Sequence, residues 1–163
     1  VFETIAEAGD AFDLKPIGMH AMDSLRIEKA FRHFGHDITC EDNVIDAGLG
    51  FAVKTDKPDF IGRDAVLKRK EEGPKSRMLQ FKLADPDPLL FHNEAILKDG
   101  EFVGYLSSGN YGHHLGAAIG MGYVPAGSAS ETDGWEIEVA GRRIAADVSL
   151  RPMYDPKSER MRN

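Results

Sequence analysis

Charged and imidazole side chains gather in one short run, SLRIEKAFRHFGHDIT at residues 24–39. Within this run His33 and His36 are three positions apart, and Asp37 follows at once. Such spacing can place metal ligands on one side of a helix. Gly35 interrupts that helix between the two imidazoles. We therefore expect no metal site, and a surface or hydrogen-bonding role is the preferred interpretation of both histidines.

The other reactive residue types do not form a nucleophile motif. His113 and His114 are adjacent, and adjacent side chains of a strand point to opposite faces, so they seldom share a metal. Cys40 is followed by two acidic residues, which disfavour its thiolate form. Ser107 and Ser108 lack the G-x-S-x-G pattern. The sequence thus predicts neither a catalytic cysteine nor a serine hydrolase.

Glycine-rich segments raise the separate question of a phosphate or ligand loop. GLGFAV (48–53) and GAAIGMG (116–122) match neither G-x-G-x-x-G nor a P-loop with its lysine. SSGNYGHHLG (107–116) surrounds Tyr111 with glycine and polar residues. A loop of this kind is either a ligand wall or a long connection between barrel strands, and both interpretations stay open. The first makes Tyr111 a candidate ligand contact.

Composition limits the class of protein. The 163 residues are 42% hydrophobic and 29% charged, which is typical of a globular chain long enough for a sizeable core. The net charge of −7 disfavours generic nucleic-acid or anionic-membrane binding. The single cysteine predicts a reducing, cytoplasmic location, and no apolar run approaches the roughly 20 residues that span a bilayer.

Three segments have helical patterns: residues 1–9, closed by Gly9, residues 19–33, stopped by Gly35, and residues 59–73. The sequence begins within the first pattern and without a methionine. This indicates a chain cut inside or just before a helix, and a processed mature N-terminus is the alternative.

The second helical segment carries the charged residues of the opening run. Glu28 and Arg32 have the i, i+4 spacing of a stabilising pair. Arg26 is placed to form an ion pair with Asp23 or with an acidic residue elsewhere. We expect Lys29 and Arg32 to lie on a solvated helix face.

From residue 74 onward the pattern changes to short alternating segments bounded by turn residues. Residues 42–56 also contain a glycine-rich turn leading into a short expected strand, FAV. The sequence predicts an α+β fold, in which residues 1–73 end an α/β region and residues 74–163 form a small antiparallel β-barrel or sandwich. The expected strands are 77–83, 94–99, 101–109, 116–124, 135–141 and 142–149.

Four segments, in this order and with matching gaps, carry a family likeness: GMHAMDSLRIEKAFRHFGHDIT, AGLGFAVKTDKPDFIGRDAVL, VGYLSSGNYGHHLGAAIGMGYVP and RPMYDPKSERMR. Together they resemble the glycine cleavage T-protein (aminomethyltransferase) family. The likeness is greatest to its copies fused behind a flavin oxidoreductase, as in dimethylglycine and sarcosine dehydrogenases. It covers essentially the whole chain.

The resemblance implies a fold and an activity. Residues 1–73 would be the C-terminal part of the folate-binding domain, and residues 74–163 the C-terminal β-barrel. The implied reaction passes a one-carbon unit from an N-methylated glycine-type donor to tetrahydrofolate, with FAD expected only in a fused upstream domain. The catalytic aspartate is expected upstream of Val1, so residues 1–163 alone would be inactive. The implied partners are folate, a small amine and the upstream domains of the same chain, without nucleic acid or membrane.

The resemblance also implies folate contacts. Family members carry an A-R-D motif whose arginine contacts folate, and Met22 stands at that position in AMD. A thioether cannot replace the bidentate donors of a guanidinium. Nine residues on, Phe31 stands where some members have an aromatic folate contact. Met22, Phe31 and Tyr111 are therefore the candidate folate-binding residues, although plain core is the alternative for Met22 and Phe31. Two other functions stay open: a non-catalytic folate-fold module, and a folate-dependent demethylase of another donor.

Overall fold

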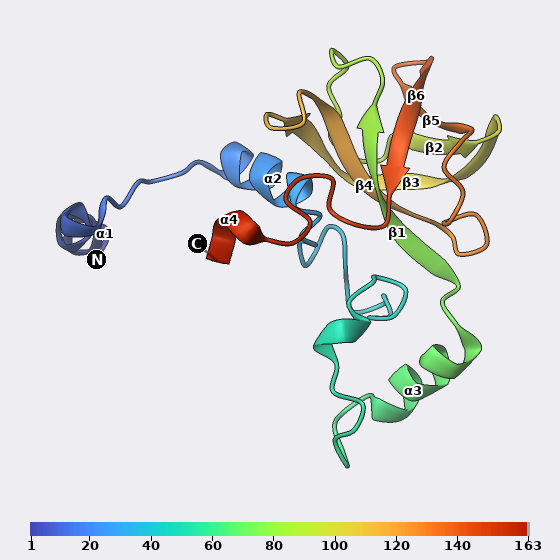
Figure 1. Ribbon diagram of the computed structural model, residues 1–163, viewed down its shortest axis with the longest axis horizontal. Helices are drawn as coiled ribbons and strands as arrows, with labels where there is room; N and C mark the ends of the chain where they lie inside the picture. The colour runs from blue at the N-terminus through green and yellow to red at the C-terminus, as the bar shows by residue number, and fades with distance from the viewer. Residues whose placement is uncertain (163) are drawn as a thin grey trace.

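A computed structural model describes residues 1–162 and is dominated by a closed antiparallel β-barrel (Figure 1). Its hydrogen-bonded order is β1-β4-β3-β2-β5-β6, and closure leaves no free sheet edge. The barrel confirms the predicted α+β class, while the division of the chain at residues 73 and 74 stays a prediction. The strands are β1 (Ser76–Leu83), β2 (Ala95–Lys98), β3 (Glu101–Gly112), β4 (Ala117–Pro125), β5 (Trp135–Val139) and β6 (Arg142–Ser149).

The barrel interior holds the main hydrophobic core. Alternate side chains of each strand point inward, which is why the predicted alternation located the strands. Phe81 and Trp135 are its largest buried residues, and their rings meet edge to face with centroids 5.9 Å apart. The indole Nε1 of Trp135 donates to the carbonyl of Glu131 at 2.9 Å, so this buried donor is satisfied.

Strands β3 and β4 approach each other closely at glycines. A Cβ atom at Gly122 would lie 2.5 Å from the carbonyl oxygen of Tyr105 and 2.6 Å from Cδ1 of Ile96. Neither the strand backbone nor the packed core can move away without cost. A side chain is therefore excluded at this position.

We expect Gly122→Ala to lower the free energy of unfolding by about 2 kcal/mol, because it overpacks the barrel wall. Urea denaturation followed by the fluorescence of Trp135, the single tryptophan, measures this change. Gly127→Ala is the matched control, since a Cβ atom there meets nothing within 4 Å. Equal midpoints for the two variants would contradict the steric argument.

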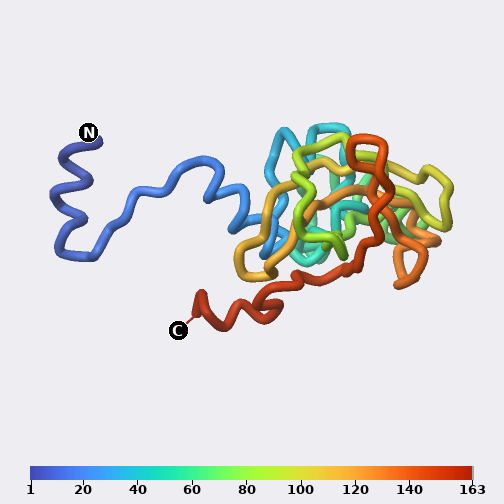
Figure 2. The backbone as a smooth tube through the Cα atoms, turned by 90° about the horizontal axis from the view of Figure 1, so that it is seen from above, coloured from blue at the N-terminus to red at the C-terminus, as the bar shows by residue number. Residues whose placement is uncertain are grey.

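The helices lie outside the barrel (Figure 1). Helix α2 (Met19–Glu28) packs against β3 and β4, whereas α1 (Phe2–Gly9) extends away from the body (Figure 2). The C-terminal segment returns from β6 past the end of α2. The remaining elements are η1 (Asp10–Phe12), η2 (Gly50–Ala52), α3 (Arg63–Glu72) and α4 (Glu159–Arg162).

Three expectations about local structure were wrong. Helix α2 ends at Glu28 instead of residue 33, because Ala30 adopts a left-handed φ of 51°. The amides of Ala30 and Phe31 then donate to the carbonyls of Ile27 and Arg26, which is the Schellman pattern normally built on glycine. The expected strand FAV is part of η2 and its flank, and residues 107–112 belong to β3 instead of a loop.

Candidate functional site

Helix α2 is held against the barrel by its buried face. Ile27 and Glu28 are fully buried, and Ser24 Oγ donates to the carbonyl of Tyr111 at 2.6 Å. From β1, the side-chain amide of Gln80 donates to the carbonyls of Ile27 and Glu28 at 2.7 and 3.2 Å. These hydrogen bonds fix where the residues at the two ends of α2 lie relative to the barrel.

Arg26 joins α2, the following loop and β3 through one guanidinium. Its Nε donates to Asp23 Oδ1 at 2.7 Å, and Nη1 donates to Asp37 Oδ2 at 2.7 Å. Its Nη2 donates to Ser108 Oγ at 2.9 Å. The Asp37 side chain is fully buried and also accepts from Ser107 Oγ. The predicted Arg26–Asp23 pair is present, and Asp37 is the second acidic partner.

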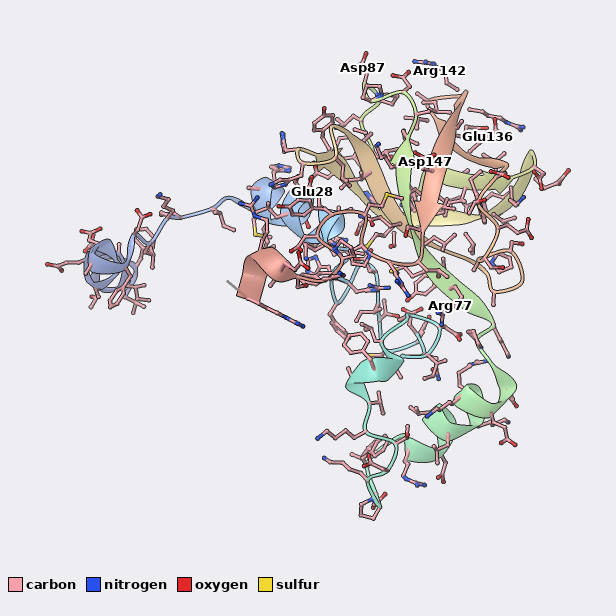
Figure 3. The ribbon with its side chains drawn as sticks, viewed as in Figure 1. Glu28, Arg77, Asp87, Glu136, Arg142 and Asp147 are labelled. Carbon is pink, nitrogen blue, oxygen red and sulfur yellow. The ribbon has the colours of Figure 1, made fainter. Side chains whose placement is uncertain are left out.

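Glu28 forms a second buried cluster where α2 meets the barrel (Figure 3). Its Oε1 accepts from the backbone amides of His114 and Leu115 at 2.6 and 3.2 Å. Its Oε2 lies 2.6 Å from His114 Nδ1, and the His114 ring stacks on Tyr154 with centroids 4.2 Å apart. The expected pair of Glu28 with Arg32 is absent from the described residues, because Glu28 points toward the barrel.

Lys29 ties the end of α2 to the C-terminal segment. Its Nζ donates to the carbonyl and the carboxylate of Asp155, at 2.5 and 3.0 Å. Burial raises the pKa of Asp155, but hydrogen bonds from Lys29 and from backbone amides outweigh burial and hold it below its usual value. A lowered folded-state pKa means that the contact stabilises at neutral pH and weakens as acid protonates Asp155.

The expected solvated face was therefore wrong for both cations. Lys29 is 8% exposed, and Arg32 donates to the carbonyls of Ala47 and Ala30 at 3.1 and 2.5 Å. Burial lowers the pKa of Arg32 from its ordinary value, and nearby Tyr123 and Asp37 act in the opposite sense. The helix ends four residues before Arg32, so the assumed i, i+4 geometry does not exist.

The structure does not bring the three candidate folate residues into one cavity. Phe31 is 46% exposed and lines a groove of about 510 Å³. Met22 is half-buried on α2, and it is not among the residues that line this groove. Tyr111 lies on β3, is 36% exposed and meets His113 edge to face at 5.2 Å. It is likewise outside the groove lining.

The groove beside Phe31 has an aromatic and apolar lining with a cationic rim. Phe51 from η2 exposes most of its ring, and Leu49, Leu150 and Pro152 add apolar wall. Arg151 is exposed, and its guanidinium has no acidic partner within residues 1–162. Sequence reasoning missed Phe51 and Arg151, because nothing in the local sequence shows that the glycine-rich turn at residues 48–51 lies beside residue 150.

This arrangement suits a flat, partly apolar ligand that carries a carboxylate. Exposed phenyl rings stack on heteroaromatic rings, and a free guanidinium binds a carboxylate bidentately. Residues 1–162 contain no group of three or more histidine, cysteine, aspartate or glutamate side chains that could hold a metal ion. Within the same residues, no helix has the length and apolar character needed to cross a bilayer.

Two family models match the chain. Residues 1–57 match the GCVT N-terminal domain, and residues 77–155 match the glycine cleavage T-protein C-terminal barrel domain. Among solved structures, the glycine cleavage system aminomethyltransferase T from Bartonella henselae superposes with a TM-score of 0.83 at 29% sequence identity. That match covers 94% of this chain and 44% of the other.

Curated relatives fall into two groups. The 4-methylaminobutanoate oxidase (formaldehyde-forming) of Paenarthrobacter nicotinovorans is 45% identical over 99% of this chain and 20% of its own length. The mitochondrial dimethylglycine dehydrogenase of Mus musculus is 33% identical, over 99% of this chain and 19% of its own. The aminomethyltransferase of Halothermothrix orenii is 38% identical over 93% of this chain and 42% of its own length. The chain thus spans about a fifth of the first two relatives and about two fifths of the third.

Proposed function

Because the chain belongs to the glycine cleavage T-protein family, we propose that it forms the C-terminal part of a tetrahydrofolate-dependent aminomethyltransferase-like domain. The family performs folate-dependent one-carbon transfer, and its relatives here are enzymes. The observation that carries the proposal for this chain is the groove beside Phe31, whose aromatic walls and free Arg151 match a pteridine with a glutamate tail.

The proposed donor is an N-methylated amine of the glycine type, oxidised by a flavin domain in the same polypeptide. The relative named dimethylglycine dehydrogenase supports a donor of the glycine type, and the relative named 4-methylaminobutanoate oxidase supports an N-methylated amine more generally. A flavin-domain sequence in the same reading frame would support it, and its absence would favour a folate-dependent demethylase of another donor. A cytoplasmic location belongs to the same proposal, supported by the single free, exposed Cys40.

The residues of the chain fit tetrahydrofolate in part. Phe31 and Phe51 offer stacking surfaces, and Arg151 offers a carboxylate partner. Met22 offers no hydrogen-bond donor at the position of the family arginine, so the polar edge of the pteridine needs donors from elsewhere. When bound, tetrahydrofolate supplies the nitrogen that accepts the one-carbon unit. The groove residues would hold and orient it, which is the contribution that positioning makes to catalysis.

We further propose that the catalytic aspartate lies in the region of the longer relatives that this chain does not span. The chain alone would then bind folate without turnover. Any formation of methylenetetrahydrofolate by residues 1–163 would overturn the placement of that aspartate.

We expect Phe31→Ala to weaken the binding of 5-formyltetrahydrofolate by about tenfold, because it removes an aromatic stacking surface. Calorimetric titration of the chain measures the affinity. Phe102→Ala is the control, since Phe102 is also half exposed, at 55%, but lies on β3 outside the groove. An equal loss of affinity in both variants would show that the groove beside Phe31 is not the folate-binding site.

A non-catalytic folate-fold module is the second candidate, and Met22 favours it because the thioether cannot replace the family arginine. The two functions differ in one measurement. If the unmodified chain and Met22→Arg both fail to bind 5-formyltetrahydrofolate at millimolar concentration, the folate proposal fails and the module remains.

A further inference from the structure

A second cavity, of about 370 Å³, is lined by residues of α2, whereas the groove beside Phe31 is lined by residues beyond the end of that helix. This cavity uses none of the candidate folate residues. We call it the histidine pocket: it is enclosed by His20, Asp23 and Arg26 of α2, by His36, by residues 89–92 between β1 and β2, and by residues 107–110 of β3. Its volume is within the range of small-molecule sites.

One wall of the histidine pocket is apolar, and its backbone packs closely against β3. Leu89 and Phe91 are each 58% exposed although both line this cavity. Behind them, Gly109 of β3 packs so tightly that a Cβ atom there would lie 2.6 Å from Cβ of Leu90 and 2.9 Å from the amide nitrogen of Phe91. The backbone that carries Leu89 and Phe91 is therefore packed against β3 at residues 90 and 91.

The floor of the histidine pocket combines the lining residues Asp23 and Arg26 with Asp37, which is buried and pairs with Arg26 without lining the cavity itself. Arg26 is bound by two carboxylates, Asp23 and Asp37, and its third nitrogen donates to Ser108. The three groups together carry a formal charge of −1, and the guanidinium has no free edge for an incoming carboxylate. Asp23 keeps its second oxygen outside these hydrogen bonds and remains 32% exposed.

Three imidazoles complete the rim. Within residues 1–162, the rings of His20, His36 and His92 take part in no hydrogen bond, so their nitrogens are available to a ligand. The His36 ring packs against His33 with centroids 4.7 Å apart, which leaves the ring faces of His20 and His92 as the available ones. Aromatic faces attract a cation through their quadrupole, and they also accept apolar N-alkyl groups. An anionic floor below an apolar and aromatic wall favours a small organic cation over an anion.

We propose that the histidine pocket binds a small protonated amine that carries N-alkyl groups. The ammonium N–H donates to the free oxygen of Asp23, and the alkyl groups contact Leu89 and Phe91. The proposal does not depend on folate binding, because the two cavities share no lining residue.

Titration of the ¹⁵N-labelled chain with N-methylbutylammonium, hexanoate and hexan-1-ol tests this assignment at about pH 8, where free imidazole is neutral. We expect saturable amide shifts at residues 89–92 and 107–110 with the ammonium ion, and at least about tenfold weaker binding of the other two probes. Tighter binding of hexanoate, or shifts that spread over the barrel without saturation, would overturn the proposal.

Two variants locate the site. Asp23→Asn keeps an oxygen for Arg26 but removes the charge, and we expect it to weaken ammonium binding by about tenfold. Asp147→Asn is its control, because Asp147 is exposed on β6 (Figure 3) and is not among the residues that line the pocket. Phe91→Ala changes only the exposed wall and keeps the test decisive if Asp23→Asn fails to fold. Unchanged affinity in Phe91→Ala would contradict the assignment.

Discussion

Arg26→Met is expected to lower the free energy of unfolding by about 3–5 kcal/mol, which is the cost of leaving a buried charge without its partner. The Asp37 side chain is fully buried, and the Arg26 guanidinium lies 2.7 Å away as its single ion-pair partner within the described residues. The hydrogen bonds from the His33 amide and from Ser107 remain, but they cannot neutralise the carboxylate. Urea denaturation followed by Trp135 fluorescence measures the loss without adding salt.

A surface arginine provides the matched control. Arg142→Met removes the same charge from β6, where the 3.1 Å pair with Asp85 is largely exposed (Figure 3). Exposed pairs contribute at most about 1 kcal/mol, so we expect a small change. The double variant Arg26→Met/Asp37→Asn should recover part of the loss, because it no longer buries a charge. A double variant no more stable than Arg26→Met would refute this explanation.

Glu28→Ala is expected to cost about 3 kcal/mol, because it leaves the backbone amides of His114 and Leu115 without an acceptor and opens space at the α2–barrel contact. Glu28→Gln should cost about 1 kcal/mol or less, since its amide oxygen still accepts both N–H groups and its amino group can donate to a neutral imidazole. The same urea titration, with far-ultraviolet circular dichroism as a second probe, measures both values.

Glu136→Ala is the control for Glu28, because Glu136 is a carboxylate on the barrel strand β5, far from α2 (Figure 3). We expect a change within about 0.5 kcal/mol at such a site. If Glu28→Gln destabilised as much as Glu28→Ala, the charge of Glu28 would be essential instead of its acceptor geometry. If neither variant changed stability, α2 would not depend on this cluster.

The barrel could be predicted because its signals are local. Alternating apolar residues and short turns located all six strands, and the helical apolar pattern of residues 19–33 located the helix that packs against the barrel. The helix end could not be predicted in the same way. Ala30 has no intrinsic preference for a left-handed φ, and Arg32 stabilises that turn by donating to its carbonyl.

The polar clusters at α2 were unpredictable because their partners are distant in sequence. The local sequence around Glu28 is that of a surface helix residue. Its carboxylate nevertheless accepts hydrogen bonds from backbone amides 86 and 87 residues away. Phe51 was assigned to a strand, and its place in the groove depends on the turn at residues 48–51. Helical spacing shows which face of the helix a residue occupies. It does not show whether that face contacts solvent or another part of the chain.

The contact of Lys29 with Asp155 also bears on the order of folding. These residues are 126 positions apart, and every barrel strand lies between them in the sequence. Closing so long a loop is entropically costly until the intervening strands have paired. During synthesis, α2 therefore leaves the ribosome long before its last partner exists. The contact between Lys29 and Asp155 therefore forms after the barrel has closed. The surface beside Phe31 is completed only when residues 150–156 have been synthesised.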